Sequence, residues 1–135
     1  MKNFNIMAIT TALLAQSSLS FAQNSIVPYN TTIERLLTSD NFGECMFEPT
    51  IGPDQVGMDC KNQWVTVDCA AVLGVSTKSV AASKWSTIQL AYATGKEVRV
   101  RIDPNVKISG WCWMEQVQTC PDGGCPDPQP VVTPE

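Results

Sequence analysis

The sequence predicts an α+β domain, a small antiparallel β-barrel with one main helix, held together by disulfide bonds. Three observations favour this class. Hydrophobic residues recur at helical spacing over residues 77–93, alternating strand patterns lie on both sides of that segment, and six cysteines occur in 135 residues. A chain of this length fits one domain with a thin core, which extracellular domains commonly strengthen with disulfides.

Residues 1–22 predict an export signal. Lys2 precedes an uncharged, mostly apolar stretch over residues 4–19, and Ser20-Phe21-Ala22 offers a small-x-small cleavage pattern. The stretch is too short and too polar for a membrane span. We therefore expect a secreted or periplasmic protein, with a single domain over residues 23–120 and a Pro-rich tail over residues 121–135.

The composition excludes several classes of function. Acidic residues outnumber basic ones by 13 to 9, which argues against a nucleic-acid-binding surface. The absence of His removes Ser-His-Asp and Cys-His catalysis and every His-containing zinc site. Neither a serine-nucleophile motif nor a calcium-loop motif occurs. We therefore expect a protein that is not an enzyme and that uses neither a metal nor a cofactor.

The cysteines predict structural disulfides rather than a metal site, since no C-x-x-C pattern accompanies them. All of them lie downstream of the export signal: Cys45, Cys60, Cys69, Cys112, Cys120 and Cys125. The turn-forming residues between Cys120 and Cys125 predict a bridge between these two. The other four share two bridges, whose pairing the sequence leaves open.

Short elements are expected before the main helix. Thr31 and Glu34 fit a capping box, which predicts a short helix at this point. Residues 44–48 predict a strand, and residues 49–57 a loop rich in Pro and Gly. Residues 63–69 alternate in polarity and predict a half-buried strand. Its core side would carry Val65, Val67 and Cys69, and its solvent side Trp64, Thr66 and Asp68.

The longest helical signal covers residues 77–93. The hydrophobic stripe of this helix consists of Ala81, Trp85, Ile88, Ala91 and Tyr92. Ser76 or Thr77 can cap its start, and Gly95 fits a left-handed residue that ends it.

The period of the pattern changes to that of a strand after this helix. Val98, Val100 and Ile102 alternate with polar residues, which predicts a strand with one buried face. Residues 103–105 predict a turn, residues 106–108 a short strand, residues 109–110 a second turn and residues 111–118 a last strand.

The candidate binding residues lie on the last two strands. Arg99 and Arg101 occupy the polar side of one strand, and Trp111 and Trp113 share a face of the other. An exposed Trp pair near the arginines would offer stacking surfaces and bidentate donors for a sugar, including sialic acid. Two alternatives stay open: the arginines are only the solvated side of their strand, or the Trp pair faces the core.

One stretch carries a more specific arrangement. Cys69 precedes the helix, the helix ends in Leu90-Ala91-Tyr92-Ala93-Thr94-Gly95-Lys96, and Val98-Arg99-Val100 follows at once. With the Cys120-x4-Cys125 loop, this arrangement resembles the B subunits of subtilase cytotoxin and typhoid toxin, two bacterial toxins. The matched segment is mainly residues 69–100.

The resemblance implies an OB-fold, that is, an OB-like barrel, which assembles as a homopentamer. The main helix would line the pore of the ring, where the C-terminal tail of a toxin A chain would bind. Each subunit would bind a sialylated host glycan or glycoprotein. The sugar-contacting Tyr of the family corresponds to Ile102 in this chain.

We therefore expect a secreted, non-enzymatic, toxin B-subunit-like protein that recognises a host glycan and carries an A chain. The alternative is a free-standing periplasmic or secreted structural or inhibitory module that binds a protein and has no sugar ligand. A third hypothesis is a hydrolase that uses only carboxylates, with Glu44, Glu48 and Asp68 as candidates.

Overall fold

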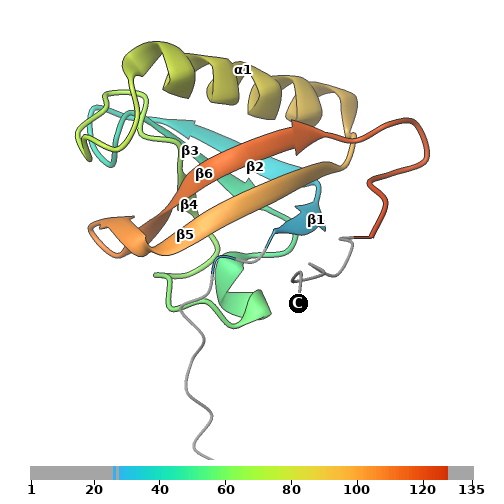
Figure 1. Ribbon diagram of the computed structural model, residues 1–135. Helices are drawn as coiled ribbons and strands as arrows, with labels where there is room; N and C mark the ends of the chain where they lie inside the picture. Colours follow the sequence, from blue (N-terminus) through green and yellow to red (C-terminus); the bar gives the residue numbers. More distant parts are fainter. Residues whose placement is uncertain (1–25, 27, 128–135) are drawn as a thin grey trace, which may run out of the picture.

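The computed structural model describes residue 26 and residues 28–127 (Figure 1). The predicted export signal and residues 128–135 of the predicted tail lie outside the described residues. In chain order the elements are β1 (Tyr29–Thr31), β2 (Ile33–Thr38), β3 (Cys45–Pro49), the 3-10 helix η1 (Pro53–Val56), β4 (Val65–Thr66), α1 (Lys78–Thr94), β5 (Val98–Ile108) and β6 (Trp111–Thr119).

The strands form one six-stranded sheet in the order β1-β5-β6-β4-β3-β2. Neighbouring strands are antiparallel except β4 and β6, which are parallel. The predicted α+β class is confirmed, but the sheet is open, because β1 and β2 end the order without pairing to each other. Thr32 alone separates these two edge strands, so the sheet must curl until Thr31 and Ile33 lie within about 7 Å.

Helix α1 lies across one side of the curled sheet, and η1 lies on the opposite side (Figure 1). The core between α1 and the sheet is apolar, and its fully buried side chains include Phe47, Val65, Val67, Ile88, Val98, Val100, Ile102 and Met114. Within the described part of the chain, no helix is both long and apolar enough to cross a membrane.

The predicted main helix is confirmed at both ends. The Thr77 hydroxyl accepts a hydrogen bond from the Val80 amide (3.3 Å), and Gly95 adopts the left-handed conformation with φ 64°. Of the predicted stripe, Ala81, Ile88 and Ala91 are buried and Trp85 is half-buried. Tyr92 is 48% exposed, although it lies one turn after Ile88 on the same side of the helix.

The short helix predicted at Thr31 is wrong. The residues after it form β2, which pairs with β3 from Ile33 opposite Pro49 to Thr38 opposite Cys45. The Thr31 hydroxyl accepts a hydrogen bond from the Ile51 amide (3.1 Å) instead of capping a helix. Long-range strand pairing therefore outweighs the local capping signal.

The half-buried strand predicted at residues 63–69 is also corrected. Only Val65–Thr66 pair as β4, and the supposedly solvated Thr66 and Asp68 are fully buried. Thr66 donates to the Phe42 carbonyl (2.8 Å), and the Asp68 carboxylate accepts from the amides of Val72 (2.9 Å) and Leu73 (3.0 Å). These polar side chains can be buried because they satisfy the backbone of adjacent loops.

The turn predicted at residues 103–105 does not reverse the chain. Strand β5 runs through it, and the register with β6 shifts between Asp103 and Lys107. The Asp103 carboxylate accepts from the Asn105 amide (2.8 Å), so turn-forming chemistry produces a bulge here. The reversal occurs at the second predicted turn, where Ser109 and Gly110 both have positive φ.

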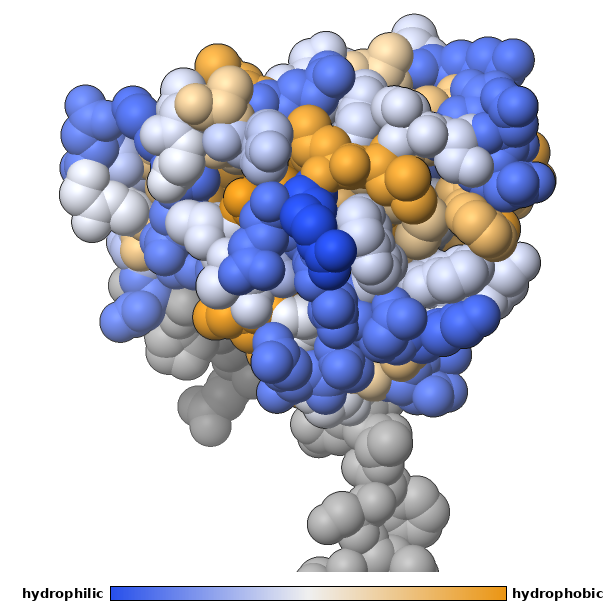
Figure 2. All heavy atoms as spheres, turned by 180° about the vertical axis from the view of Figure 1, so that it is seen from behind, coloured by the Kyte–Doolittle hydropathy of each residue, from blue (hydrophilic) through white to orange (hydrophobic). Residues whose placement is uncertain are grey.

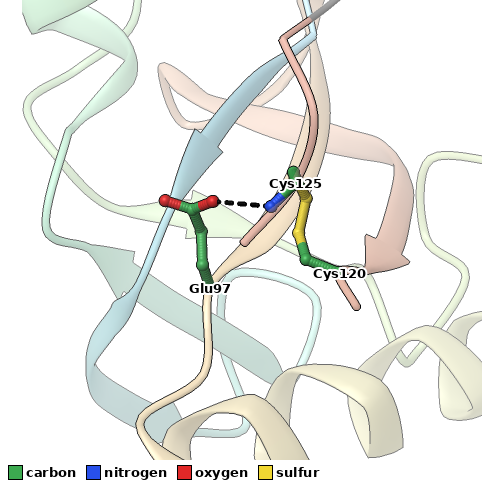
Figure 3. A group of neighbouring side chains, drawn as sticks. All are labelled: Glu97, Cys120 and Cys125. Carbon is green, nitrogen blue, oxygen red and sulfur yellow. Dashed lines mark hydrogen bonds between the residues drawn. A yellow bond between two sulfur atoms is a disulfide. The ribbon is translucent and has the colours of Figure 1, made fainter. Parts of the chain in front are cut away.

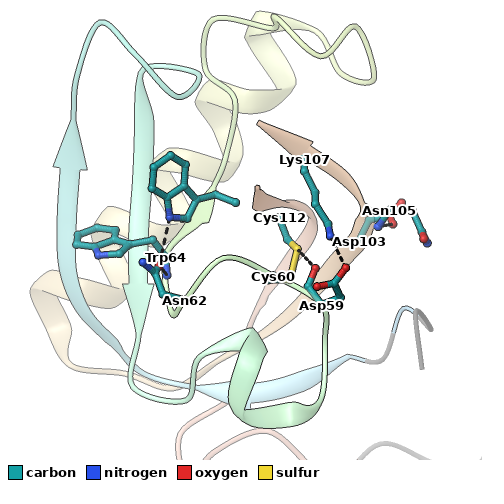
Figure 4. Close-up of a disulfide and its surroundings, with 9 residues drawn as sticks. Asp59, Cys60, Asn62, Trp64, Asp103, Asn105, Lys107 and Cys112 are labelled. Carbon is teal, nitrogen blue, oxygen red and sulfur yellow. Dashed lines mark hydrogen bonds and ion pairs between the residues drawn. A yellow bond between two sulfur atoms is a disulfide. The ribbon is translucent and has the colours of Figure 1, made fainter. Parts of the chain in front are cut away.

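All six cysteines form disulfides. The predicted Cys120–Cys125 bridge is confirmed, and the remaining pairs are Cys45–Cys69 and Cys60–Cys112. The first of these joins the start of β3 to the segment before α1, and the second joins the loop after η1 to β6 (Figure 4).

Candidate functional site

The outer face of β5 and β6 carries the predicted arginines. Arg99 lies opposite Gln118, and Arg101 lies opposite Gln116. Their neighbours Val98 and Val100 point into the core, so strand alternation turns the four polar side chains outward. A hollow of about 180 Å³ lies on this face, lined by Pro28, Arg99, Arg101, Gln116 and Gln118. We call it the arginine hollow.

Arg99 is held by hydrogen bonds, and Arg101 by an ion pair. Arg99 donates from Nε to Asn30 Oδ1 (3.0 Å) and from Nη2 to the carbonyl of Pro126. Arg101 Nε lies 2.8 Å from Glu115 Oε2, and the Arg101 side chain is 44% exposed. The terminal nitrogens of Arg101 make no hydrogen bond to any described residue, so they remain available to a ligand in the arginine hollow.

The two predicted tryptophans lie elsewhere. Trp113 is only 7% exposed and lies beneath Lys84, whose Nζ is 4.5 Å from the ring centroid. Burial of the Lys84 ammonium lowers its pKa. Trp111 is half-buried and lies five residues from Gln116 along β6, about 16 Å at the usual strand rise. The structure therefore does not bring an exposed Trp pair to the arginines.

A polar and aromatic network around residues 59–64 surrounds Trp111. Its indole Nε1 donates to Asn62 Oδ1 (3.2 Å), and its ring makes an edge contact with Phe42 (centroids 4.4 Å apart). Figure 4 shows Asn62 beside Trp64, with the nearby Cys60–Cys112 bridge and the Asp59–Lys107 ion pair (3.0 Å). Sequence patterns did not predict this network, because its members come from separate segments of the chain.

Glu48 and Arg35 form a second arrangement that the sequence did not predict. The Glu48 carboxylate is 4% exposed and accepts from Arg35 Nε and from Gln63 Nε2 (2.6 Å). The hydrogen bond from Arg35 holds the pKa of Glu48 below its ordinary value. The guanidinium of Arg35 also lies over the Trp64 ring, 5.3 Å from its centroid. Arg35 and Glu48 are partners in the antiparallel ladder of β2 and β3, so strand pairing brings their side chains together.

The carboxylates considered for hydrolysis do not share a site. Glu48 bonds to Arg35 and Gln63, and Asp68 bonds to two backbone amides. Glu44 is exposed and lies at a different hollow, of about 410 Å³, between the β2–β3 turn and α1. This hollow, which we call the Trp85 cavity, is lined by Thr38, Ser39, Asp40, Glu44, Cys45, Cys69 and Trp85.

Glu97 lies beside the Cys120–Cys125 bridge (Figure 3). Its carboxylate accepts from the Cys125 amide (3.0 Å) and fixes the start of the predicted tail against β5. Lys96 pairs with Asp122 of the same loop (2.8 Å). The acidic and sulfur atoms are close enough to suggest a metal site, but the disulfide occupies both sulfurs, so the group is structural.

The face seen from behind is mixed in polarity. Figure 2 shows a hydrophobic area near its middle, with strongly hydrophilic residues on the border. The large hydrophobic side chains that are exposed are spread over several elements, and they include Leu37 of β2 and Val80, Leu90 and Tyr92 of α1.

No family model matches this chain, and neither a curated protein nor a solved structure matches it.

Proposed function

We propose that this chain is a secreted, non-enzymatic binding subunit of the toxin B-subunit type, with an OB-like barrel. Strand connectivity supports the barrel. The consecutive strands β1 and β2 pair with β5 on one side and β3 on the other, β4 runs parallel to β6, and α1 lies between β4 and β5 along the chain. The OB-fold is a partly open Greek-key barrel, so an open sheet is compatible with it.

The ligand is a sialylated host glycan, bound at the arginine hollow. The observation that carries this proposal is the pairing of Arg99 and Arg101 with Gln118 and Gln116 on one solvent-facing surface. A guanidinium matches the planar carboxylate of a sialic acid, and the glutamine amides match sugar hydroxyls. Arg101 supplies the free donors, while Asn30 holds Arg99 in place.

A glycan array probed with the oxidised protein tests this function. We expect signals on sialylated glycans, and we expect Arg101→Gln to weaken them by about tenfold, as loss of a charge-assisted hydrogen bond would. Lys78→Gln, an equal charge change on exposed helix surface, is the matched control. An array without signal above background would remove the lectin function.

Assembly separates the two candidate roles. A B subunit forms a ring of five that carries an A chain, so light scattering on the oxidised protein should give five times the monomer mass. Its gene should lie beside a reading frame for an exported A chain. A monomer at micromolar concentration without such a neighbour would favour the free-standing protein-binding module instead.

Three disulfides support export, since such bonds persist in oxidising compartments. N-terminal sequencing of protein recovered outside the cytoplasm should begin at Gln23, because the signal would be cleaved after Ala22. Recovery of the uncleaved chain in the cytoplasm would contradict secretion.

A further inference from the structure

Three of the four tryptophans lie under a cation of the same chain. Arg35 covers Trp64, with 5.3 Å to the ring centroid. Lys61 covers Trp111 at 4.1 Å, and Lys84 covers Trp113 at 4.5 Å. Trp85 is the exception: no described Lys or Arg lies over its ring. Its half-buried indole packs against the core and lines the Trp85 cavity.

The Trp85 cavity also holds two carboxylates without a counter-ion. Asp40 and Glu44 are both exposed, and neither carboxylate pairs with a described side chain. The cavity lining contains no Lys or Arg, so its charge is negative. An indole and two carboxylates around an open space match a positively charged group, which gains both a cation–π contact and ionic hydrogen bonds.

The wall of the cavity is fixed before any ligand arrives. The Cys45–Cys69 disulfide lies in the wall, and the Ala70 amide donates to the Gly43 carbonyl (3.1 Å) beside it. Gly43 has φ 82°, and a Cβ at this position would lie 2.8 Å from Asp68 Cα. A site formed in advance loses little conformational freedom when it binds.

We propose that the Trp85 cavity binds an organic cation, namely a primary ammonium or guanidinium group. Trp85 provides the ring face, and Asp40 and Glu44 provide the counter-charge. The volume of about 410 Å³ accommodates the end of a lysine or arginine side chain as well as a small free amine. This site is separate from the arginine hollow, which carries the opposite charge.

The test is a nuclear magnetic resonance titration of the oxidised, nitrogen-15-labelled protein with n-butylammonium chloride. The indole N–H signal of Trp85 should shift saturably, while those of Trp64, Trp111 and Trp113 stay in place, because each already has its own cation. A second arm uses the peptide acetyl-Gly-Lys-Gly-amide. Tighter binding of the peptide would identify a protein lysine as the source of the cation, and equal binding would identify a small amine.

Charge variants test whether Asp40 and Glu44 bind the cation. The double variant Asp40→Asn/Glu44→Gln should raise the dissociation constant by about threefold to tenfold, the range expected for partly exposed ion pairs. Glu34→Gln/Asp54→Asn makes the same charge change at exposed positions outside the cavity and should leave it unchanged. The proposal is overturned if n-butanol or methyl β-galactoside shifts Trp85 as strongly as n-butylammonium does, or if no ligand shifts it.

Discussion

At the scale of single residues, the buried carboxylates show how polar groups hold this small domain together. Glu48 joins β2 to the loop before β4 through Arg35 and Gln63. Asp68 closes the turn that follows it through two backbone amides. Neither role could be predicted from the sequence, because a carboxylate in an alternating pattern is expected to face solvent.

Acid should destabilise the protein through Glu48. The hydrogen bond from Arg35 lowers the pKa of Glu48 in the folded state, so the unfolded state takes up its proton first as the pH falls. The stabilising contribution is present at neutral pH and is lost on acidification. Between pH 7 and about pH 4, the free energy of unfolding measured in urea should fall less for Glu48→Gln than for the wild type. Glu34→Gln, a substitution at a nearby exposed position, should lose as much free energy of unfolding over this pH range as the wild type does.

Gly43 is a second residue whose replacement should be costly. Its φ of 82° disfavours other residues, and an added Cβ would lie 2.8 Å from the Asp68 backbone. We expect Gly43→Ala to lower the free energy of unfolding by about 2–4 kcal/mol in chemical denaturation. Gly123→Ala is the control, since φ there is 100° but no atom lies within 4 Å. Equal losses of unfolding free energy in the two variants would show that the contact with the Asp68 backbone does not contribute to the cost.

At the scale of elements, local periodicity predicted α1, β6 and the first part of β5, but it did not predict that β5 continues through residues 103–105 or that β2 pairs with β3. Helix α1 and strands β5 and β6 have patterns several turns or residues long, with Gly95 and Gly110 at their ends. Strand β2 lacks such a pattern, because only Ile33 is buried and the rest is exposed or half-buried. Its conformation depends on β3, which a local capping signal cannot reveal.

The capping of α1 can be tested alone. Thr77→Ala removes the acceptor of the Val80 amide and should cost about 1 kcal/mol of stability in urea unfolding. Ser83→Ala, at an exposed position inside the same helix, should cost nothing, because Ala has the higher helix propensity. A loss in Ser83→Ala as large as that in Thr77→Ala would contradict a capping role.

At the scale of the whole molecule, the disulfides connect segments that the sheet alone does not fix. The sequence predicted Cys120–Cys125, because turn residues bring these two together locally. The other pairs depend on the complete topology and could not be chosen in advance. The candidate binding residues were predicted only in part: alternation placed Arg99 and Arg101 on the outer face, but Trp113 is buried beneath Lys84 of α1.

The bridges should differ in their contribution to stability. Cys60 and Cys112 are 52 residues apart, and Cys120 and Cys125 are 5 apart. A disulfide that closes a longer loop removes more conformational freedom from the unfolded chain. Replacing Cys60 and Cys112 with Ala should therefore lower the free energy of unfolding in urea by about 2 kcal/mol more than replacing Cys120 and Cys125. An equal cost for the two pairs would show that loop length does not govern their effect.

The single residue between β1 and β2 has a consequence for how the chain assembles during synthesis. β2 can form its ladder as soon as β3 has emerged, whereas Tyr29–Thr31 must wait for Val98–Val100. In the nascent protein β2 is therefore paired early, while the backbone of β1 stays unpaired until most of the polypeptide has left the ribosome. The β1–β5 ladder therefore forms late, and it places the first strand of the domain beside a strand from the last third of the chain.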